Sequence, residues 1–210
     1  MTNLRTRCVG LGLTACLMMP ALASAEAREF DFKDPKGVNS IAFVLDSVTE
    51  PIMGIAQGLS GKVTFDPQDP KSLSGTIELD AAGVNCAHNG MTKVLHGEDW
   101  IDVKSYPTIT FALKEVRKVE SPETNVFKLE VAGELTMKGV TKPITVPVSA
   151  TYLPGQLGNR MRGKNGDLLV LRSTFSVMRK DFNVKPDMGN QVVAEEIELR
   201  VSIVGGHETK

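Results

Sequence analysis

The chain has 210 residues, of which 41% are hydrophobic, and a formal net charge of −1 from 24 basic and 25 acidic side chains. This balance shows neither the basic footprint of a nucleic-acid-binding protein nor an acidic tail. The length is sufficient for one domain with a substantial core. No internal repeat, long linker or low-complexity tract divides it. We therefore expect one domain and no nucleic-acid partner.

The first 25 residues differ in kind from the rest of the chain. Arg5 and Arg7 precede an apolar run, and Ala23-Ser24-Ala25 has the small-residue pattern of a signal-peptide cleavage site. The run is too short, and too interrupted by Gly and Pro, for a membrane span. The sequence therefore predicts a signal peptide over residues 1–25 and a mature domain over residues 26–210, periplasmic or secreted, without a stable transmembrane segment.

A second processing route stays open at Leu13–Cys16. This segment resembles a bacterial lipoprotein box, in which Cys16 would be acylated and become an anchored N-terminus. Because Cys8 and Cys16 both lie in the leader, the mature chain keeps only Cys86. A single cysteine excludes an internal disulfide in this predicted exported domain.

From Phe30 onward almost every informative segment alternates apolar and polar residues, which is typical of half-buried antiparallel strands. Asp66–Gly75 is rich in Asp, Pro and Ser and is predicted to be a turn. Eight or so strands at this spacing indicate an all-β antiparallel barrel or sandwich. The residues predicted to face inward are Phe43, Leu45, Ile77, Leu79, Ile109, Phe111, Leu113, Leu129, Leu135, Met137, Ile144, Val146, Leu171 and Phe175. The last strand adds Ile197, Leu199, Val201 and Ile203 on one face.

The segment Gly133–Val148 is predicted to be a β-hairpin. Leu135 and Met137 share one face before the turn, and Ile144, Val146 and Val148 share a face after it. Gly139 gives the bend its conformational freedom. Pro143 has no amide to contribute to a ladder, so it suits the start of the second strand.

One segment departs from the strand pattern. Met91, Val94 and Leu95 have helical spacing, Asn89 is a candidate N-cap and Gly97 a candidate helix stop. A second short turn is expected near the only tryptophan. The sequence thus predicts a short helical region within residues 88–103.

The chain resembles the YceI-like family of secreted proteins over nearly its whole mature length. The hairpin contains the motif L-T-x-x-G-V-T-K-P, which resembles the central motif of this family. The resemblance continues in four further motifs, G-x-x-G-x-V-x-F-D-P at Gly58–Pro67, I-x-L-D-A-A at Ile77–Ala82, Y-P-x-I-T-F at Tyr106–Phe111 and R-x-D-F at Arg179–Phe182. The family usually carries an Arg-Asp pair in its helical segment, whereas this chain has Asn89-Gly90-Met91-Thr92, so the resemblance leaves open whether the ligand is the common isoprenoid or a different lipid.

The resemblance implies a single eight-stranded, lipocalin-like barrel whose apolar lumen holds an isoprenoid or another long-chain lipid. Burial of such a chain contributes about 0.8 kcal/mol per methylene group. From the residues alone an alternative stays open, because an eight-stranded barrel is also narrow enough to be filled by its own side chains. That alternative is a structural β-domain with a filled core.

Two sets of residues suggest chemistry beyond apolar burial. Arg172 and Arg179 are candidates for an anionic headgroup at the barrel mouth, with solubilising strand charges as the alternative. Cys86, His88 and His96 are the candidate ligands of an alternative metal or redox site, although their spacing matches no standard zinc motif. The sequence contains no G-x-S-x-G, P-loop or dinucleotide fingerprint. We therefore predict a binding protein rather than an enzyme, with no catalytic residues and no cofactor besides the lipid.

Overall fold

A computed structural model describes residues 27–209, so the predicted signal peptide and Cys16 lie outside the described residues. One antiparallel sheet contains the strands β1 (Arg28–Asp31), β2 (Ser40–Ser47), β3 (Ile52–Ala56), β4 (Leu59–Asp66), β5 (Asp69–Asp80), β6 (Val84–Cys86), β7 (Thr108–Glu123), β8 (Val126–Met137), β9 (Val140–Leu153), β10 (Gly166–Met178) and β11 (Val193–Glu208). The helical elements are η1 (Ala81–Gly83), α1 (Asn89–Leu95), α2 (Leu157–Arg160) and η2 (Arg179–Phe182).

The sheet closes into an eight-stranded barrel, as the sequence predicts. The order β1-β4-β5-β7-β8-β9-β10-β11 is completed by pairing of Asp31 in β1 with Gly206 in β11. The strands β2, β3 and β6 continue this wall beyond β1, β4 and β5, because β2 pairs with β11, β3 with β2 and β6 with β3. Three of the eight strand positions of the barrel are therefore occupied by two successive shorter strands with a break between them. The alternation pattern did not predict these breaks.

The largest of these breaks lies between β1 and β2, and the Asn39 side chain bridges it. Its Oδ1 accepts a hydrogen bond from the Val204 N–H at 3.0 Å, and its Nδ2 donates to the Val204 carbonyl at 3.1 Å. The same Nδ2 donates to the Phe32 carbonyl, and Arg160 donates to Oδ1. Asn39 is 3% exposed. Its amide thus replaces the backbone partner that β11 lacks between Ser202 and Gly206.

Asp34 organises the loop that leads from β1 to Asn39. Its carboxylate accepts hydrogen bonds from the N–H groups of Lys36, Val38 and Asn39 and pairs with Arg160 at 3.0 Å. Burial alone would raise the pKa of Asp34, but these N–H donors and the guanidinium lower it overall. The charged form of Asp34 therefore holds this loop together.

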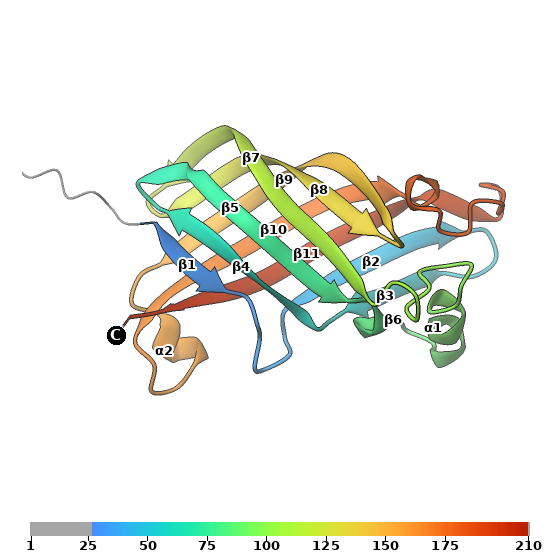
Figure 1. The fold of residues 1–210 in the computed structure, drawn as a ribbon, viewed down its shortest axis with the longest axis horizontal. Coiled ribbons are helices and arrows are strands. Elements are labelled where there is room, and N and C mark those ends of the chain that lie inside the picture. Colours follow the sequence, from blue (N-terminus) through green and yellow to red (C-terminus); the bar gives the residue numbers. More distant parts are fainter. Residues whose placement is uncertain (1–26, 210) are drawn as a thin grey trace, which may run out of the picture.

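Core side chains fill the interior at one end of the barrel. This end carries α2 and the C-terminus (Figure 1). The Phe65 and Phe127 rings meet edge to face at 5.5 Å, and Phe30 meets Tyr152 in the same way. The core residues of this end are Phe30, Phe32, Val63, Phe65, Val116, Phe127, Leu129, Val131, Ala150, Tyr152 and Leu169, none more than 7% exposed. Close packing of this kind stabilises the filled end without a contribution from a ligand.

The predicted hairpin is confirmed, with a turn of two residues. Lys138 and Gly139 have φ angles of 49° and 73°, and Met137 pairs with Val140 across them. Positive φ at both central residues is the pattern of a type I′ turn, whose twist matches that of the flanking strands. Pro143 does not mark the start of the second strand, because β9 begins at Val140.

Two boundary predictions were wrong. The predicted turn over Asp66–Gly75 shrinks to Pro67 and Gln68, because β5 begins at Asp69. β5 pairs with β7 only from Gly75 onward, so its earlier residues have one free edge on which a proline is tolerated.

The helix α1 is confirmed, but its N-cap is His88, whose Nδ1 accepts a hydrogen bond from the Gly90 N–H. Among residues 27–209, no helix has the length and apolar character needed to cross a membrane.

Candidate ligand-binding cavity

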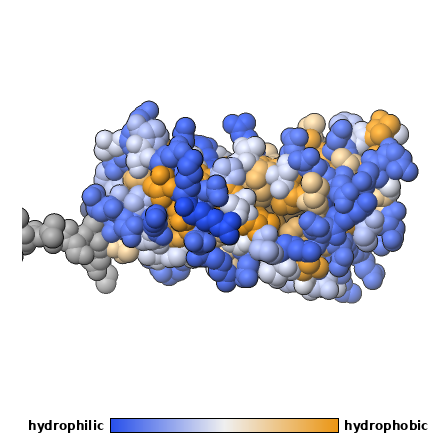
Figure 2. All heavy atoms as spheres, turned by 90° about the horizontal axis from the view of Figure 1, so that it is seen from above, coloured by the Kyte–Doolittle hydropathy of each residue, from blue (hydrophilic) through white to orange (hydrophobic). Residues whose placement is uncertain are grey.

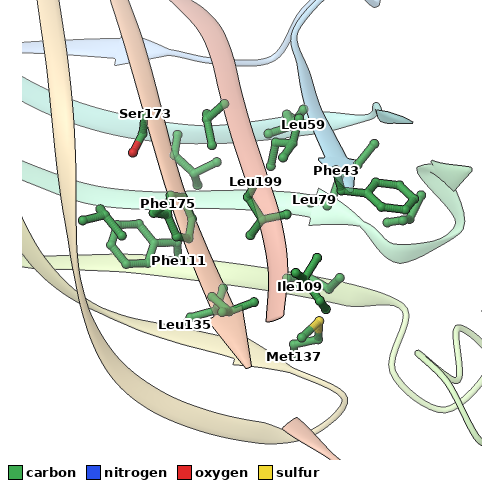
Figure 3. Close-up of a pocket in the computed structure, with 18 of the residues that line it drawn as sticks. Phe43, Leu59, Leu79, Ile109, Phe111, Leu135, Met137, Ser173, Phe175 and Leu199 are labelled. Carbon is green, nitrogen blue, oxygen red and sulfur yellow. The ribbon is translucent and has the colours of Figure 1, made fainter. Parts of the chain in front are cut away.

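The other end of the barrel, which carries α1, is hollow. The cavity there has a volume of about 210 Å³, and its wall is apolar except at Thr110, Arg172 and Ser173. In Figure 3 side chains from several strands converge on this space, with Phe111 and Phe175 on one side and Phe43 and Leu79 on the other. On the outer surface polar side chains dominate, as Figure 2 shows for one face, with apolar side chains visible between them.

Twelve of the fourteen predicted lumen residues line this cavity. They are Phe43, Leu45, Ile77, Leu79, Ile109, Phe111, Leu113, Leu135, Met137, Val146, Leu171 and Phe175. Leu129 instead packs in the filled end at 4% exposure. Ile144 packs partly buried against both core clusters and does not line the cavity. The alternation pattern thus identified the inward face of each strand, and contact of these residues with a ligand stays a prediction.

Two loops contribute to the wall of the hollow end, and the sequence analysis assigned neither of them to the cavity. Trp100 and Ile101, after α1, and Val184, after η2, are part of the cavity wall. The Lys138 ammonium group donates to the carbonyls of Asp99 and Asn183, so the hairpin turn ties both loops together. Sequence patterns do not detect such contacts, because the partners are 39 and 45 residues from Lys138 along the chain.

The structure gives Arg179 a different role from the predicted headgroup contact. The residue is fully buried, and its guanidinium donates to the carbonyls of Ala194, Val184, Lys185, Met188 and Val193. All of these belong to the segment after η2, so Arg179 holds that loop in shape. Its five donors in a fixed fork suit a cage of carbonyl groups. Arg172, in contrast, is exposed on β10 beside Ser202, to which it donates.

The structure does not bring Cys86, His88 and His96 together as a metal site. The His88 ring caps α1, and the His96 ring bonds through Nε2 to the Val84 carbonyl at 2.7 Å. No group of three or more His, Cys, Asp or Glu side chains in the described part of the chain has the geometry to hold a metal ion. Cys86 is buried, and burial raises the pKa of its thiol.

A closed antiparallel barrel that is packed at one end and encloses an apolar cavity at the other defines the class of this protein. A family profile described as YceI-like domain matches residues 34–205. The chain therefore belongs to the YceI-like family, which confirms the resemblance found in its motifs.

The relatives extend over nearly the whole chain. Protein YceI of Escherichia coli O6:H1 is 27% identical over 197 residues, which cover 93% of this chain and 95% of that protein. UPF0312 protein YE1254 of Yersinia enterocolitica is 30% identical with the same coverage. Among solved structures, BcnA of Burkholderia cenocepacia superposes with a TM-score of 0.61 and 25% identity, covering 79% of this chain and 95% of BcnA. A polyisoprenoid-binding domain from Saccharophagus degradans has the same fold, with a TM-score of 0.59 at 9% identity, covering 87% and 99%.

Proposed function

We propose that this protein is an exported carrier or store that buries the chain of an isoprenoid-like or other long-chain lipid in the hollow end of its barrel. The observation that carries the proposal is the cavity, because a wall that is apolar except at three residues favours a hydrocarbon over a polar ligand. A solved relative of the same fold is described as a polyisoprenoid-binding domain, which supports the same ligand class. The mechanism is burial of apolar surface, without the making or breaking of a bond.

The first test is identification of lipid that co-purifies with the protein, by mass spectrometry of an organic extract. Leu199 on β11 points into the cavity, whereas its neighbour Glu198 is exposed on the outer face. Leu199→Trp fills the cavity and should reduce the co-purified lipid at least tenfold. Glu198→Trp adds the same side chain outside and should retain the lipid. Equal retention by both variants would place the lipid elsewhere.

The second test uses the native Trp100 as a reporter, because it forms part of the cavity wall. Titration with geranylgeraniol, a neutral prenyl alcohol, should change the emission of Trp100 with saturation. An emission unchanged by this alcohol, in protein that also yields no extracted lipid, would refute the proposed function.

The predicted export of the protein and its cleavage site are tested separately. The Ala23-Ser24-Ala25 pattern supports cleavage after Ala25 and a mature form that begins at Glu26. Intact-mass measurement of the cell-envelope fraction should give the mass of residues 26–210. A mass that corresponds to an acylated N-terminal Cys16 would overturn the unanchored form.

A further inference from the structure

The ladder between β9 and β10 ends half-way along both strands. Pairing runs only from Leu168 opposite Leu153 to Arg172 opposite Ser149. β9 nevertheless stays paired with β8 along its length, and β10 with β11. No ladder pair joins residues 140–148 of β9 to residues 173–178 of β10, and we call this stretch of the wall the seam.

The two prolines of β9 explain why the ladder ends there. The Pro147 carbonyl accepts a hydrogen bond from the Ser173 hydroxyl on β10. In an antiparallel strand the carbonyl and nitrogen of one residue face the same edge, so the nitrogen of Pro147 also faces β10. Pro143 lies four residues earlier and faces the same edge. Neither proline has an N–H to donate, so of the three residues 143, 145 and 147 of β9 whose nitrogens face β10 along the seam only Thr145 can donate.

A depression on the outer surface lies against this seam. Its lining includes residues that also line the cavity, namely Val148, Arg172, Ser173 and Val201. Only one layer of side chains therefore separates the outer depression from the lumen. The lumen side of this boundary is mainly apolar, whereas the outer side also carries charged and hydroxyl side chains.

A row of cations and hydroxyl groups crosses the outer surface at the last ladder pair, Ser149 and Arg172, where the seam begins. Strand pairing aligns Lys128, Ser149, Arg172 and Ser202 across β8, β9, β10 and β11, and Arg200 lies two residues from Ser202. All five line the depression. Lys128, Arg172 and Arg200 are exposed, and within residues 27–209 none of the three pairs with a carboxylate within 4.0 Å.

Three carboxylates lie close to this row but do not line the depression. Glu120 lies opposite Lys128 on the neighbouring strand β7, where it pairs with Lys118. Glu130 follows Lys128 by two residues on β8, and Glu198 precedes Arg200 by two residues on β11. Adjacent strands are about 4.8 Å apart, so Lys128 and Arg172, two strands apart, are separated by about 10 Å. A phosphate, diphosphate or carboxylate between them would accept charge-assisted hydrogen bonds, which are shorter and stronger than neutral ones.

We propose that the seam is a lateral portal for the ligand and that Lys128, Arg172 and Arg200 hold an anionic headgroup outside it. The lipid chain passes between β9 and β10 into the lumen, and the charged group stays hydrated at the surface, where it avoids the large cost of burying a charge. This inference rests on the proposed function and adds to it the chemical class of the headgroup and the route of uptake.

The headgroup is tested by comparing geranylgeranyl diphosphate with geranylgeraniol, which share one chain. The triple variant Lys128→Gln/Arg172→Gln/Arg200→Gln should bind the diphosphate at least tenfold more weakly than the parent and the alcohol within twofold. Equal loss for both probes, or no loss for either, would overturn the headgroup site. If inorganic diphosphate binds the parent as tightly as the prenyl diphosphate does, the row is a site for free phosphate instead. If the parent binds neither prenyl probe, the proposed function fails, and this inference with it.

The route is tested by closing the seam chemically. Continuing the β9–β10 register places Thr145 opposite Ser176, and both are exposed. In a Cys86→Ser background, Thr145→Cys/Ser176→Cys joined by a short bis-maleimide should slow association of geranylgeraniol at least tenfold in stopped flow. The matched control, Ser176→Cys/Glu198→Cys, joins β10 to β11 where a ladder already exists and should leave the rate unchanged. An unchanged rate in the seam cross-link would place uptake at the end of the barrel.

Discussion

Substitution of Asn39 by alanine should destabilise the barrel more than any other single loss of a polar side chain in the loop between β1 and β2. The side chain is 3% exposed and satisfies both backbone groups of Val204 and the carbonyl of Phe32. A buried backbone group left unpaired costs about 1–3 kcal/mol, and a partly buried hydrogen bond contributes about 0.5–1.5 kcal/mol. One buried and two partly buried groups therefore give a loss of about 2–6 kcal/mol in the free energy of unfolding.

The loss is measurable by urea unfolding followed by circular dichroism. At about 2–4 °C per kcal/mol for a domain of this size, a central value of about 4 kcal/mol lowers Tm by about 8–16 °C. The control is Asn85→Ala, because the amide of Asn85 also donates to a backbone carbonyl, that of Gly83 at 2.9 Å, but is exposed to water. Its cost should stay within about 0.5 kcal/mol.

A loss below about 1 kcal/mol in Asn39→Ala, with an unchanged m-value, would refute the reasoning. It would mean that water replaces the amide at the break between β1 and β2. The consequence extends to the cavity, because β2 carries Phe43 and Leu45 of its wall. A barrel that opens at Asn39 should also lose affinity for the lipid.

Four further outcomes are expected. Arg179→Met leaves five carbonyls without their shared donor, so it should cost about 3 kcal/mol or more, and limited proteolysis should then cut the chain within residues 183–192. The lowered pKa of Asp34 stabilises the fold above about pH 4, the pKa of an unfolded aspartate, and this contribution is lost as pH falls through the folded value, so Asp34→Asn should flatten the acid side of the stability profile. Cys86→Ser should retain the co-purified lipid, and in the parent the buried thiol should react slowly with iodoacetamide until the protein unfolds. In a Trp100→Phe background, Phe111→Trp should give blue-shifted emission that changes when geranylgeraniol is added. A blue-shifted emission that geranylgeraniol does not change would mean a filled core around that residue.

The inward faces of the strands were predictable because a period of two is a local property of the sequence. Phe111 and Phe175 line the cavity as expected. The position of a residue along the barrel axis is not a local property of the sequence. This explains why Leu129, which has the same inward periodicity, packs in the filled end and does not line the cavity. Whether the interior around Leu129 is filled depends on the rings of Phe65 and Phe127, which come from strands far apart in sequence.

Arg179 shows the same limit for polar residues. On the sequence it is one of several basic residues near the end of a strand, and nothing marks it as buried. Its partners are carbonyl groups, which every residue possesses, so no side-chain pattern identifies them. The break after β1 coincides with Asp34-Pro35-Lys36-Gly37, a turn-type sequence that our strand prediction did not use, and Gly37 has a φ of 63°.

The two ends of the barrel separate folding from binding. A cavity wall cannot contribute the full packing energy of its side chains, because atoms that face empty space lose their contact partners. Here the aromatic cluster at the filled end supplies close packing independently of any ligand. A bound lipid then adds stability as the logarithm of its concentration relative to Kd, and its release removes only that increment. A barrel packed along its whole length would be more stable but would have no place for a ligand, and one hollow along its whole length would depend on its ligand to stay folded. Under the proposed function, the filled end would keep the protein folded after it releases a lipid.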